Sequence, residues 1–113
     1  MGVNVLRLDR RLQFLRAVMG DDGYGNVITG WAAHGVPVWG ARKDVSDAEQ
    51  VAAGRLLATV TARFIIRRSS FAAGLTPMDQ FTCDGATWAI DGIKEVAQPR
   101  RGFLEITATK GAA

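Results

Sequence analysis

The sequence has very few of the residues from which catalytic and metal sites are usually built. It contains one histidine, His34, and one cysteine, Cys83. A single cysteine excludes an intrachain disulfide, and a zinc site needs three or four Cys or His ligands at close spacing. We interpret His34, which follows an expected strand, as a surface residue and Cys83 as a small core residue. No catalytic group can be assembled, so we expect no enzyme, no bound metal and no cofactor.

Long apolar runs are missing as well. No uninterrupted stretch of about 18 apolar residues occurs, so the sequence predicts no transmembrane helix and no membrane partner. The first seven residues lack the apolar core and the cleavage site of a signal peptide. We therefore expect a protein that is made in the cytoplasm.

The composition is that of an ordinary globular protein. The chain has 113 residues, of which 48% are hydrophobic and 22% are charged, and this length fits one domain with one modest core. We expect a single domain over 1–113, with a core in about 6–108 and a flexible tail at 109–113. The net charge of +3 is too small to indicate nucleic-acid binding by itself. Eleven arginines against three lysines suit protein interfaces or phosphate backbones.

Apolar residues alternate with polar ones along several short segments, which is the pattern of half-buried strands. The clearest example is residues 56–68, where Val60, Ala62, Phe64 and Ile66 share one face. Turn residues separate the segments every 8–14 positions, so we predict an all-β, mainly antiparallel fold, as a barrel or a sandwich. The expected strands cover about 6–14, 27–33, 38–43, 56–68, 81–83, 87–93 and 103–108. The expected core contains Phe64, Ile66, Trp88, Ile90, Leu104 and Ile106.

Two turns are expected to form hairpins. Residues 20–26 are rich in Gly, Asp and Asn, which tolerate turn geometry. Asp84-Gly85 lies between two strand-like runs and is a strong short-range hairpin signal.

The segment 44–55 breaks the strand pattern. Ser46 and Glu49 have the spacing of a capping box at a helix start, and Gly54 would end such a helix. A short helix and a long mobile loop are equally compatible with this composition. The basic pairs Arg67-Arg68 and Arg100-Arg101 are interpreted as solvated ends of strands or loops.

Taken in order, these pieces resemble the head–tail joining proteins of tailed bacteriophages, also called head-closure or stopper proteins. The resemblance covers about residues 6–108, and it depends on the order of the pieces because each one alone is common. Two departures are Asn26, where the family turn has a second glycine, and the absence of a proline from the central loop. The matching pieces are Leu8–Phe14, Asp22–Asn26 followed by Trp31, Val38–Ala41, Ser46 with Glu49, Thr61–Arg67, Gly74–Pro77, Gly85–Ile90 and Arg101–Ile106.

The resemblance implies a structural connector at the virion neck of a phage or phage-like particle, made in the bacterial cytoplasm. Six or twelve copies would form a ring between the portal or adaptor ring and the tail terminator or tail tube proteins. The ring would close the portal channel after DNA packaging and give the tail a docking surface. It would contact the packaged DNA without reading its sequence.

The family fold is a small β-barrel of about seven strands, with a long loop or short helix between strands three and four that reaches into the channel. By position, that element corresponds here to 44–55. The residues expected to face the channel or the portal are Asp44, Ser46, Asp47, Glu49, Gln50 and Arg55. Those expected at an interface or facing DNA are Arg67, Arg68, Arg100 and Arg101.

Two other functions stay open. The first is another small ring protein of the neck, either an adaptor or a tail-completion protein. The second, from a different class, is an OB-like nucleic-acid-binding barrel. That function would require a positively charged face with exposed aromatic side chains.

Overall fold

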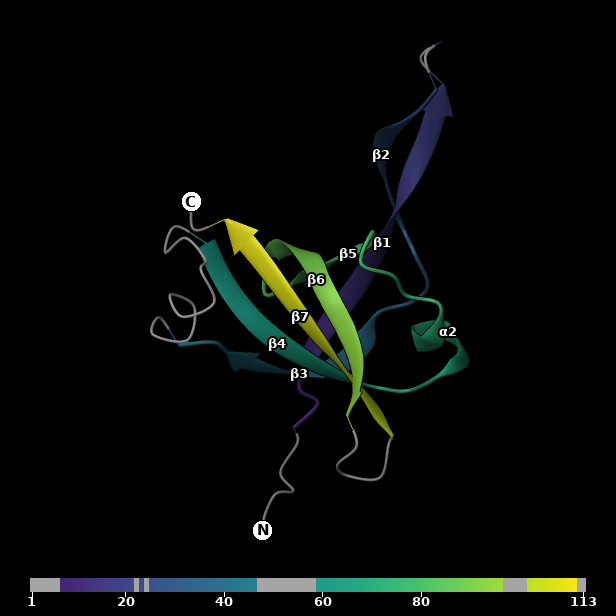
Figure 1. Ribbon diagram of the computed structural model, residues 1–113. Coiled ribbons are helices and arrows are strands. Elements are labelled where there is room, and N and C mark those ends of the chain that lie inside the picture. Colours follow the sequence, from purple (N-terminus) through teal and green to yellow (C-terminus); the bar gives the residue numbers. More distant parts are fainter. Residues whose placement is uncertain (1–6, 22, 24, 47–58, 97–101, 112–113) are drawn as a thin grey trace.

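The computed structural model describes residues 7–21, 23, 25–46, 59–96 and 102–111. Within these ranges the chain forms seven strands and one short helix (Figure 1). All strand pairs are antiparallel. In chain order the elements are β1 (Arg10–Asp21), β2 (Asn26–Ala33), β3 (Val38–Asp44), β4 (Thr59–Arg67), α2 (Ser70–Ala73), β5 (Gln80–Cys83), β6 (Ala86–Val96) and β7 (Phe103–Gly111).

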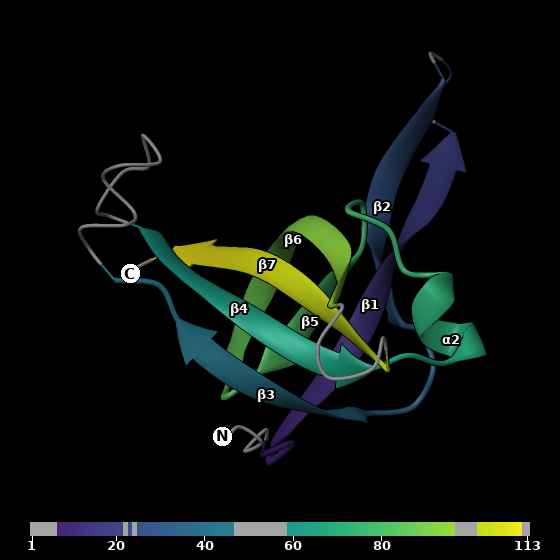
Figure 2. The ribbon, with the colours of Figure 1, turned by 60° about the horizontal axis from the view of Figure 1, so that its bottom comes forward.

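The sheet closes on itself. Six strands follow one another in the order β1-β3-β4-β7-β6-β5, and β5 returns to β1, where Phe14 pairs with Phe81. The seventh strand, β2, lies outside this closed ring and pairs with β1. Figures 1 and 2 show the resulting barrel, with α2 at one side and a β1–β2 hairpin projecting from it. The predicted small, mainly antiparallel β-barrel is confirmed.

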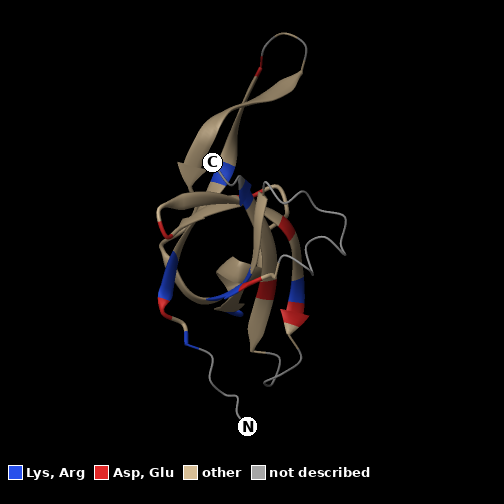
Figure 3. Cartoon of the chain, turned by 90° about the vertical axis from the view of Figure 1, so that its left-hand side faces the viewer, with Lys and Arg blue, Asp and Glu red and all other residues tan. Residues whose placement is uncertain are grey.

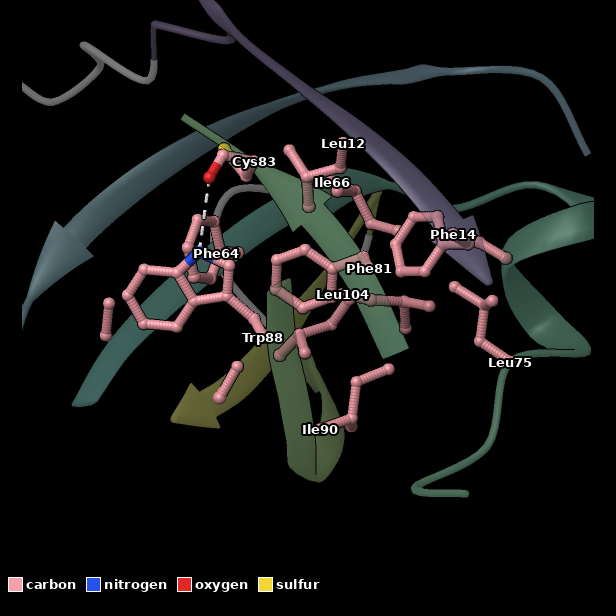
Figure 4. Close-up of a cluster of buried hydrophobic side chains, with 14 residues drawn as sticks. Leu12, Phe14, Phe64, Ile66, Leu75, Phe81, Cys83, Trp88, Ile90 and Leu104 are labelled. Atoms are coloured by element: carbon pink, nitrogen blue, oxygen red, sulfur yellow. Dashed lines mark hydrogen bonds between the residues drawn. The ribbon is translucent and has the colours of Figure 1, made fainter. Parts of the chain in front are cut away.

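The interior of the barrel is filled by the apolar faces of its strands. On β4 the inward side chains include Phe64 and Ile66, neither of which has any exposed surface. The ring of Phe64 lies edge to face against Phe81 at 4.8 Å and against Trp88 at 5.0 Å (Figure 4), an arrangement that aromatic pairs favour. All six residues that were expected in the core are buried: Phe64, Ile66, Trp88, Ile90, Leu104 and Ile106.

The Asp84-Gly85 pair forms the predicted hairpin between β5 and β6. The φ angles of Asp84 and Gly85 are 55° and 76°, and a type I′ turn requires positive φ at both central residues. The same hairpin satisfies a buried donor, because Trp88 Nε1 donates to the carbonyl oxygen of Cys83 at 3.4 Å (Figure 4). The turn that the sequence predicts therefore also helps to hold the Trp88 side chain in the core.

The helix α2 is not expected from the sequence pattern. Its N-cap is Ser69, whose Oγ accepts a hydrogen bond from the backbone nitrogen of Ala72 at 3.0 Å. Four residues make little more than one turn, which is too short for a helical period to show in the sequence. No helix within the described ranges is long and apolar enough to cross a membrane.

The last strand is longer than predicted. Thr109 pairs with Thr61 of β4 and with Ala89 of β6, and the pairing with β4 continues to Gly111. Two neighbouring strands therefore pair with Thr109 and one pairs with residues 110–111, so the strand extends three residues beyond the predicted end at 108. Residues 112–113 lie outside the described ranges.

The central segment begins where β3 ends. The backbone nitrogen of Val45 donates to the carbonyl oxygen of Thr61 at 3.1 Å, which extends the β3–β4 contact by one residue. Residues 47–58 lie outside the described ranges, so a helix and a loop both remain open for most of 44–55.

Candidate protein interface

The first strand is shared between the barrel and a projecting hairpin. Arg10–Leu12 pair with β3 and Gln13–Leu15 pair with β5, within the closed sheet. From Leu15 to Asp21 the same strand pairs with β2. We call residues 17–33 the arm. Figure 1 shows the arm extending well beyond the barrel, so this strand belongs half to the core and half to the surface.

The arm carries most of the exposed apolar side chains in the described ranges. Met19 and Ile28 are 52% and 48% exposed, although both are apolar residues within strands. Outside the arm, the exposed large apolar residues are Val36, Trp39 and Met78. On the arm they are Val18, Met19, Val27, Ile28 and Trp31. A concentration of this kind marks an interaction site in a soluble protein.

The pairing register divides these side chains between two faces. Met19 lies opposite Ile28, and Ala17 lies opposite Trp31, so these four share one face of the hairpin. That face continues the outer surface of the barrel, because alternation along β1 places it opposite the buried Leu12 and Phe14. Val18 and Val27 fall on the other face. Both faces of the arm are therefore apolar, whereas an ordinary surface hairpin has one polar face.

The arm differs from the barrel in charge as well. No lysine or arginine occurs between Arg16 and Arg42, and the only charged residues of the arm are Asp21 and Asp22. Because the whole chain has a net charge of +3, the remainder of the chain carries +5. In Figure 3 the positions of lysine and arginine, drawn in blue, lie on the barrel, and none lies on the described part of the arm. The arm is thus an acidic, apolar extension of a basic domain.

The arm also has open backbone edges. β2 lies at the end of the strand order, so its outer edge has no strand partner among the described residues. Unpaired strand edges readily add a further strand, and natural proteins usually cover or blunt them. The arm combines two features, apolar faces and open edges, that are normally buried in a contact.

An ion pair fixes the root of the arm to the barrel. Arg16 Nε and a terminal guanidinium nitrogen donate to the two carboxylate oxygens of Asp79 at 3.0 and 2.9 Å, and the same nitrogen also reaches the Gly74 carbonyl at 2.9 Å. Burial alone would raise the pKa of Asp79, but hydrogen bonds from Arg16 and from the backbone of Thr76 outweigh it and lower the pKa. This bidentate contact holds the direction in which β1 leaves the barrel.

A second contact supports the same root from the other strand. The backbone nitrogen of His34 donates to the Phe14 carbonyl at 2.8 Å, and the His34 ring packs 5.1 Å from the Phe71 ring. At Gly35, φ is 75° and a Cβ would lie only 2.4 Å from Phe71, so only glycine fits between this turn and α2. His34 is therefore a partly buried residue at the root of the arm, where its ring contacts α2.

A cluster of ion pairs lies at the other end of β1. Asp84 accepts from Arg10 at 3.1 Å and from Arg42 at 2.9 Å, and Arg42 also pairs with Asp44 at 2.8 Å. Burial would raise the pKa of Asp84, but the hydrogen bonds from Arg42 and Arg10 lower it. The Arg42 guanidinium lies 4.9 Å from the centre of the Trp88 ring. This cluster links the β5–β6 turn to β1 and to the end of β3.

The sequence-predicted site residues fall into two groups. Within the described ranges, Asp44 pairs with Arg42, Ser46 is exposed, Arg67 lies 5.6 Å from the Phe103 ring, and Arg68 pairs with Glu95 at 2.6 Å. Asp44 and Arg67 lie at the ends of neighbouring strands, at opposite ends of the β3–β4 ladder. The other predicted residues lie outside the described ranges: Asp47, Glu49, Gln50, Arg55, Arg100 and Arg101.

The described residues include one free thiol and no cluster of possible metal ligands. Cys83 is buried, as expected, and burial raises the pKa of its thiol to about 11, so it stays protonated at neutral pH. No group of three or more His, Cys, Asp or Glu that could hold a metal occurs in the described part of the chain. The arrangement is that of a folded domain with a surface for partners.

The arm was not identified from the sequence, although two signals point to it. Val18-Met19 and Val27-Ile28 are neighbouring apolar pairs, and a strand with only one buried face should alternate instead. The absence of lysine and arginine from residue 17 to residue 41 is the second signal. Together they describe a hairpin that is apolar on both faces and lacks the charged residues that usually keep an exposed edge apart from other proteins.

Comparisons with known proteins give one matching family and two solved structures with the same fold. The family model described as "phage head completion protein" matches residues 3–111. A chain in the solved structure "Virion of native gene transfer agent (GTA) particle" has the same fold, with a TM-score of 0.66 and 21% identity, over 96% of this chain and 97% of that one. The solution structure of protein SF1141 from Shigella flexneri 2a gives a TM-score of 0.62 and 24% identity, over 99% and 98% of the two chains. No curated protein sequence matches this one.

Proposed function

The chain belongs to the family of phage head completion proteins, and from that premise we propose that it forms a ring in the neck of a phage or phage-like particle. The ring closes the portal channel after DNA packaging and gives the tail a surface on which to dock. The observation that carries the proposal is the family match over residues 3–111.

The surface of the subunit supports a role in assembly. The arm exposes Met19, Ile28 and Trp31 on a hairpin that has an open edge, and such surfaces are usually covered in a complex. In this role the portal or adaptor ring lies above the subunits, and the tail terminator or tail tube proteins lie below. The segment 44–55 follows β3 and is the part that we assign to the channel. Arg100 and Arg101 remain assigned to an interface or to DNA.

The experiment is a count of subunits in purified necks. Native mass spectrometry of necks released from particles should give six or twelve copies of this chain for each portal ring. A single copy in each neck contradicts the proposal. Particles that lack this protein should contain packaged heads that lose their DNA and carry no tail. If the protein is an adaptor instead, it should be found in heads that keep their DNA.

A second function, direct binding of nucleic acid, is favoured by one local arrangement. Trp39 is 50% exposed, the guanidinium of Arg11 lies 4.4 Å from the centre of its ring, and Trp39 and Arg67 line the same shallow hollow. Basic side chains beside an exposed aromatic ring suit stacking on a base next to a phosphate. In the neck, this hollow would contact the packaged DNA.

The salt dependence of DNA binding and the effects of two variants distinguish the two functions. Binding of a labelled single-stranded DNA should weaken steeply as salt rises and should be lost in Trp39→Ala. Trp31→Ala, which removes an exposed tryptophan from the arm, serves as the matched control. If free DNA binds equally well to both variants, or does not bind at all, the nucleic-acid function is wrong and the neck proposal is unaffected.

A further inference from the structure

From the arm and from a groove on the barrel, we infer that the arm of one subunit binds in the groove between α2 and β6 of a second copy of this chain. The inference rests on the proposed ring, and it names the contact that holds neighbouring subunits together. Arm and groove are different patches of one molecule, so each subunit would use both at once.

The groove has the size and the lining to accept apolar side chains. Its volume is about 660 Å³, and its walls come from the end of β4, α2, β6 and β7. The apolar part of the lining includes Ala72, Leu75, Ile93 and Leu104. Of these, Ile93 is half-buried and packs against the core, while Ala73 at the end of α2 forms an exposed rim. The groove is large enough for two or three side chains such as those of Met19, Ile28 and Trp31.

The groove also borders an open strand edge. β6 pairs with β5 over Ala86–Ala89 and with β7 over Ala89–Val96. On its β5 side, residues 92–96 therefore have no strand partner within the described part of the chain. Ile93 and Glu95 belong to this edge and line the groove. β2 of the arm has an open edge as well, so an arm in the groove could add its strand to β6 by backbone pairing.

The arm and the rest of the chain have net charges of opposite sign. The arm carries Asp21 and Asp22 and no lysine or arginine, while the rest of the chain carries a net +5. The rim of the groove includes Arg68 and Lys94, which pair with Glu95 and Glu105 within the subunit. An acidic arm approaching a second copy is therefore attracted by the barrel as a whole, and two arms repel each other. This argues for an arm-to-barrel contact between copies rather than an arm-to-arm contact.

An arm cannot fill the groove of its own subunit. The Arg16–Asp79 pair and the contact of His34 with Phe71 fix the root of the arm beside the α2–β5 segment. Figure 1 shows that the tip points away from α2. The occupant must then come from another molecule. A contact between two different patches passes from copy to copy, and it closes into a ring when the rotation between neighbours allows.

The first test is a double-mutant cycle on self-association, measured by sedimentation velocity on the full chain. Met19→Thr with Ile28→Thr makes the arm polar and keeps residues that favour strands. Ala73→Arg fills the groove from its exposed rim. Each change should raise the dissociation constant by about tenfold or more. Combining them should add little, because both remove the same contact. Val36→Thr with Met78→Thr, at exposed apolar positions outside both patches, should change nothing.

The second test traps the contact directly. Ile28→Cys and Ala73→Cys are prepared as separate proteins and mixed under oxidising conditions, while the buried Cys83 stays unreactive. The mixture should form a disulfide between an arm and a groove, and a mixture of Val36→Cys with Ala73→Cys should not. Circular dichroism of each variant checks that the barrel is folded.

The outcomes separate this inference from the proposed ring. If the chain self-associates but the two changes act additively and no crosslink forms, the arm binds something else and the ring can still form through another contact. If polar arm variants self-associate normally but fail to bind portal or tail proteins, the occupant of the arm is one of those proteins and the inference is wrong. If the chain shows no self-association alone or in necks, both the inference and the ring are wrong.

Discussion

The barrel and the arm both contain large apolar residues in strands, but the barrel buries these side chains and the arm exposes them. In the barrel, Phe64 and Trp88 have no exposed surface, and each strand pairs with two others along at least part of its length. In the arm, Met19 and Ile28 are about half exposed, and β2 has an open outer edge. A two-stranded hairpin has no core of its own and is marginal in isolation. One strand, β1, therefore contributes its first half to the core of the subunit and presents exposed apolar surface with its second half.

The largest expected effect is on the barrel side of this comparison. Phe64→Ala should lower the free energy of unfolding by about 3–5 kcal/mol, because the side chain is fully buried between Phe81 and Trp88. Urea denaturation followed by circular dichroism measures the change. Val36→Ala, at an exposed apolar position, is the control and should stay within about 0.5 kcal/mol of the parent. A Phe64→Ala protein that melts within a degree or two of the parent would show that the barrel core tolerates a large cavity.

A smaller effect is expected where the arm joins the barrel. Asp79→Asn should cost about 1.5–3 kcal/mol, because it removes a charge-assisted bidentate contact with Arg16. The pKa of Asp79 is lowered in the folded protein. Its carboxylate therefore contributes stability that is present above the unfolded pKa of about 3.9 and is lost as pH falls through the lower folded value.

The free energies of unfolding of the parent and of Asp79→Asn should accordingly differ by a constant amount from pH 7 down to about 4, and should converge only as the pH falls below about 4. Asp9→Asn, which changes a largely exposed carboxylate before β1, should track the parent throughout. A gap between the parent and Asp79→Asn that is absent at pH 7, or that does not shrink below about pH 4, would mean that the ion pair does not stabilise the root of the arm.

Deleting residues 47–54 should change the free energy of unfolding by less than about 1 kcal/mol, because shortening a connection costs little when the strands on either side keep their partners. The same deletion should yield particles that leak DNA or fail to join tails, as the assignment of this segment to the channel requires. Melting of the purified protein and counts of filled and tailed particles measure the two effects. Loss of the folded barrel would make the segment structural, and normal yields of full, tailed particles would remove its proposed role.

The smallest effect on stability is expected at the tip of the arm. Met19→Thr with Ile28→Thr should change the free energy of unfolding by no more than about 0.5 kcal/mol, because both side chains are half exposed and add little to the core. Thermal melting of the dilute protein measures this, with Leu12→Thr, a fully buried change on the same strand, as the opposite control. A large loss of stability in the arm variant would mean that the arm packs against its own barrel.

Much of the barrel could be predicted because its signals are local. Alternation along residues 56–68 identified the inward face of β4, and the Asp84-Gly85 pair identified a hairpin by its backbone requirement. The closing pair, Phe14 with Phe81, could not be predicted, since it joins residues far apart in the sequence and depends on how all six strands twist. The helix α2 was too short to show a period.

The candidate site was harder to predict than the fold. Sequence reasoning placed function in residues 44–55 and in two arginine pairs, following the family pattern and the charges. The arm was interpreted as an ordinary hairpin, because an apolar residue in a strand is expected to be buried. Whether Met19 and Ile28 are inside or outside depends on where β1 leaves the barrel, and that point is set by Arg16 and Asp79, which are 63 residues apart.

Because β1 runs without interruption from the closed sheet into the arm, it acts mechanically as a lever. A load applied at the tip is carried along a stiff ladder toward Leu12 and Phe14, where the strand is clamped by β3 and β5. The ladder has one compliant joint, the register shift between Val18 and Met19, where the Thr29 hydroxyl donates to the Val18 carbonyl. We expect bending to be concentrated at that joint, so that the outer half of the arm changes its angle while the inner half and the barrel keep theirs.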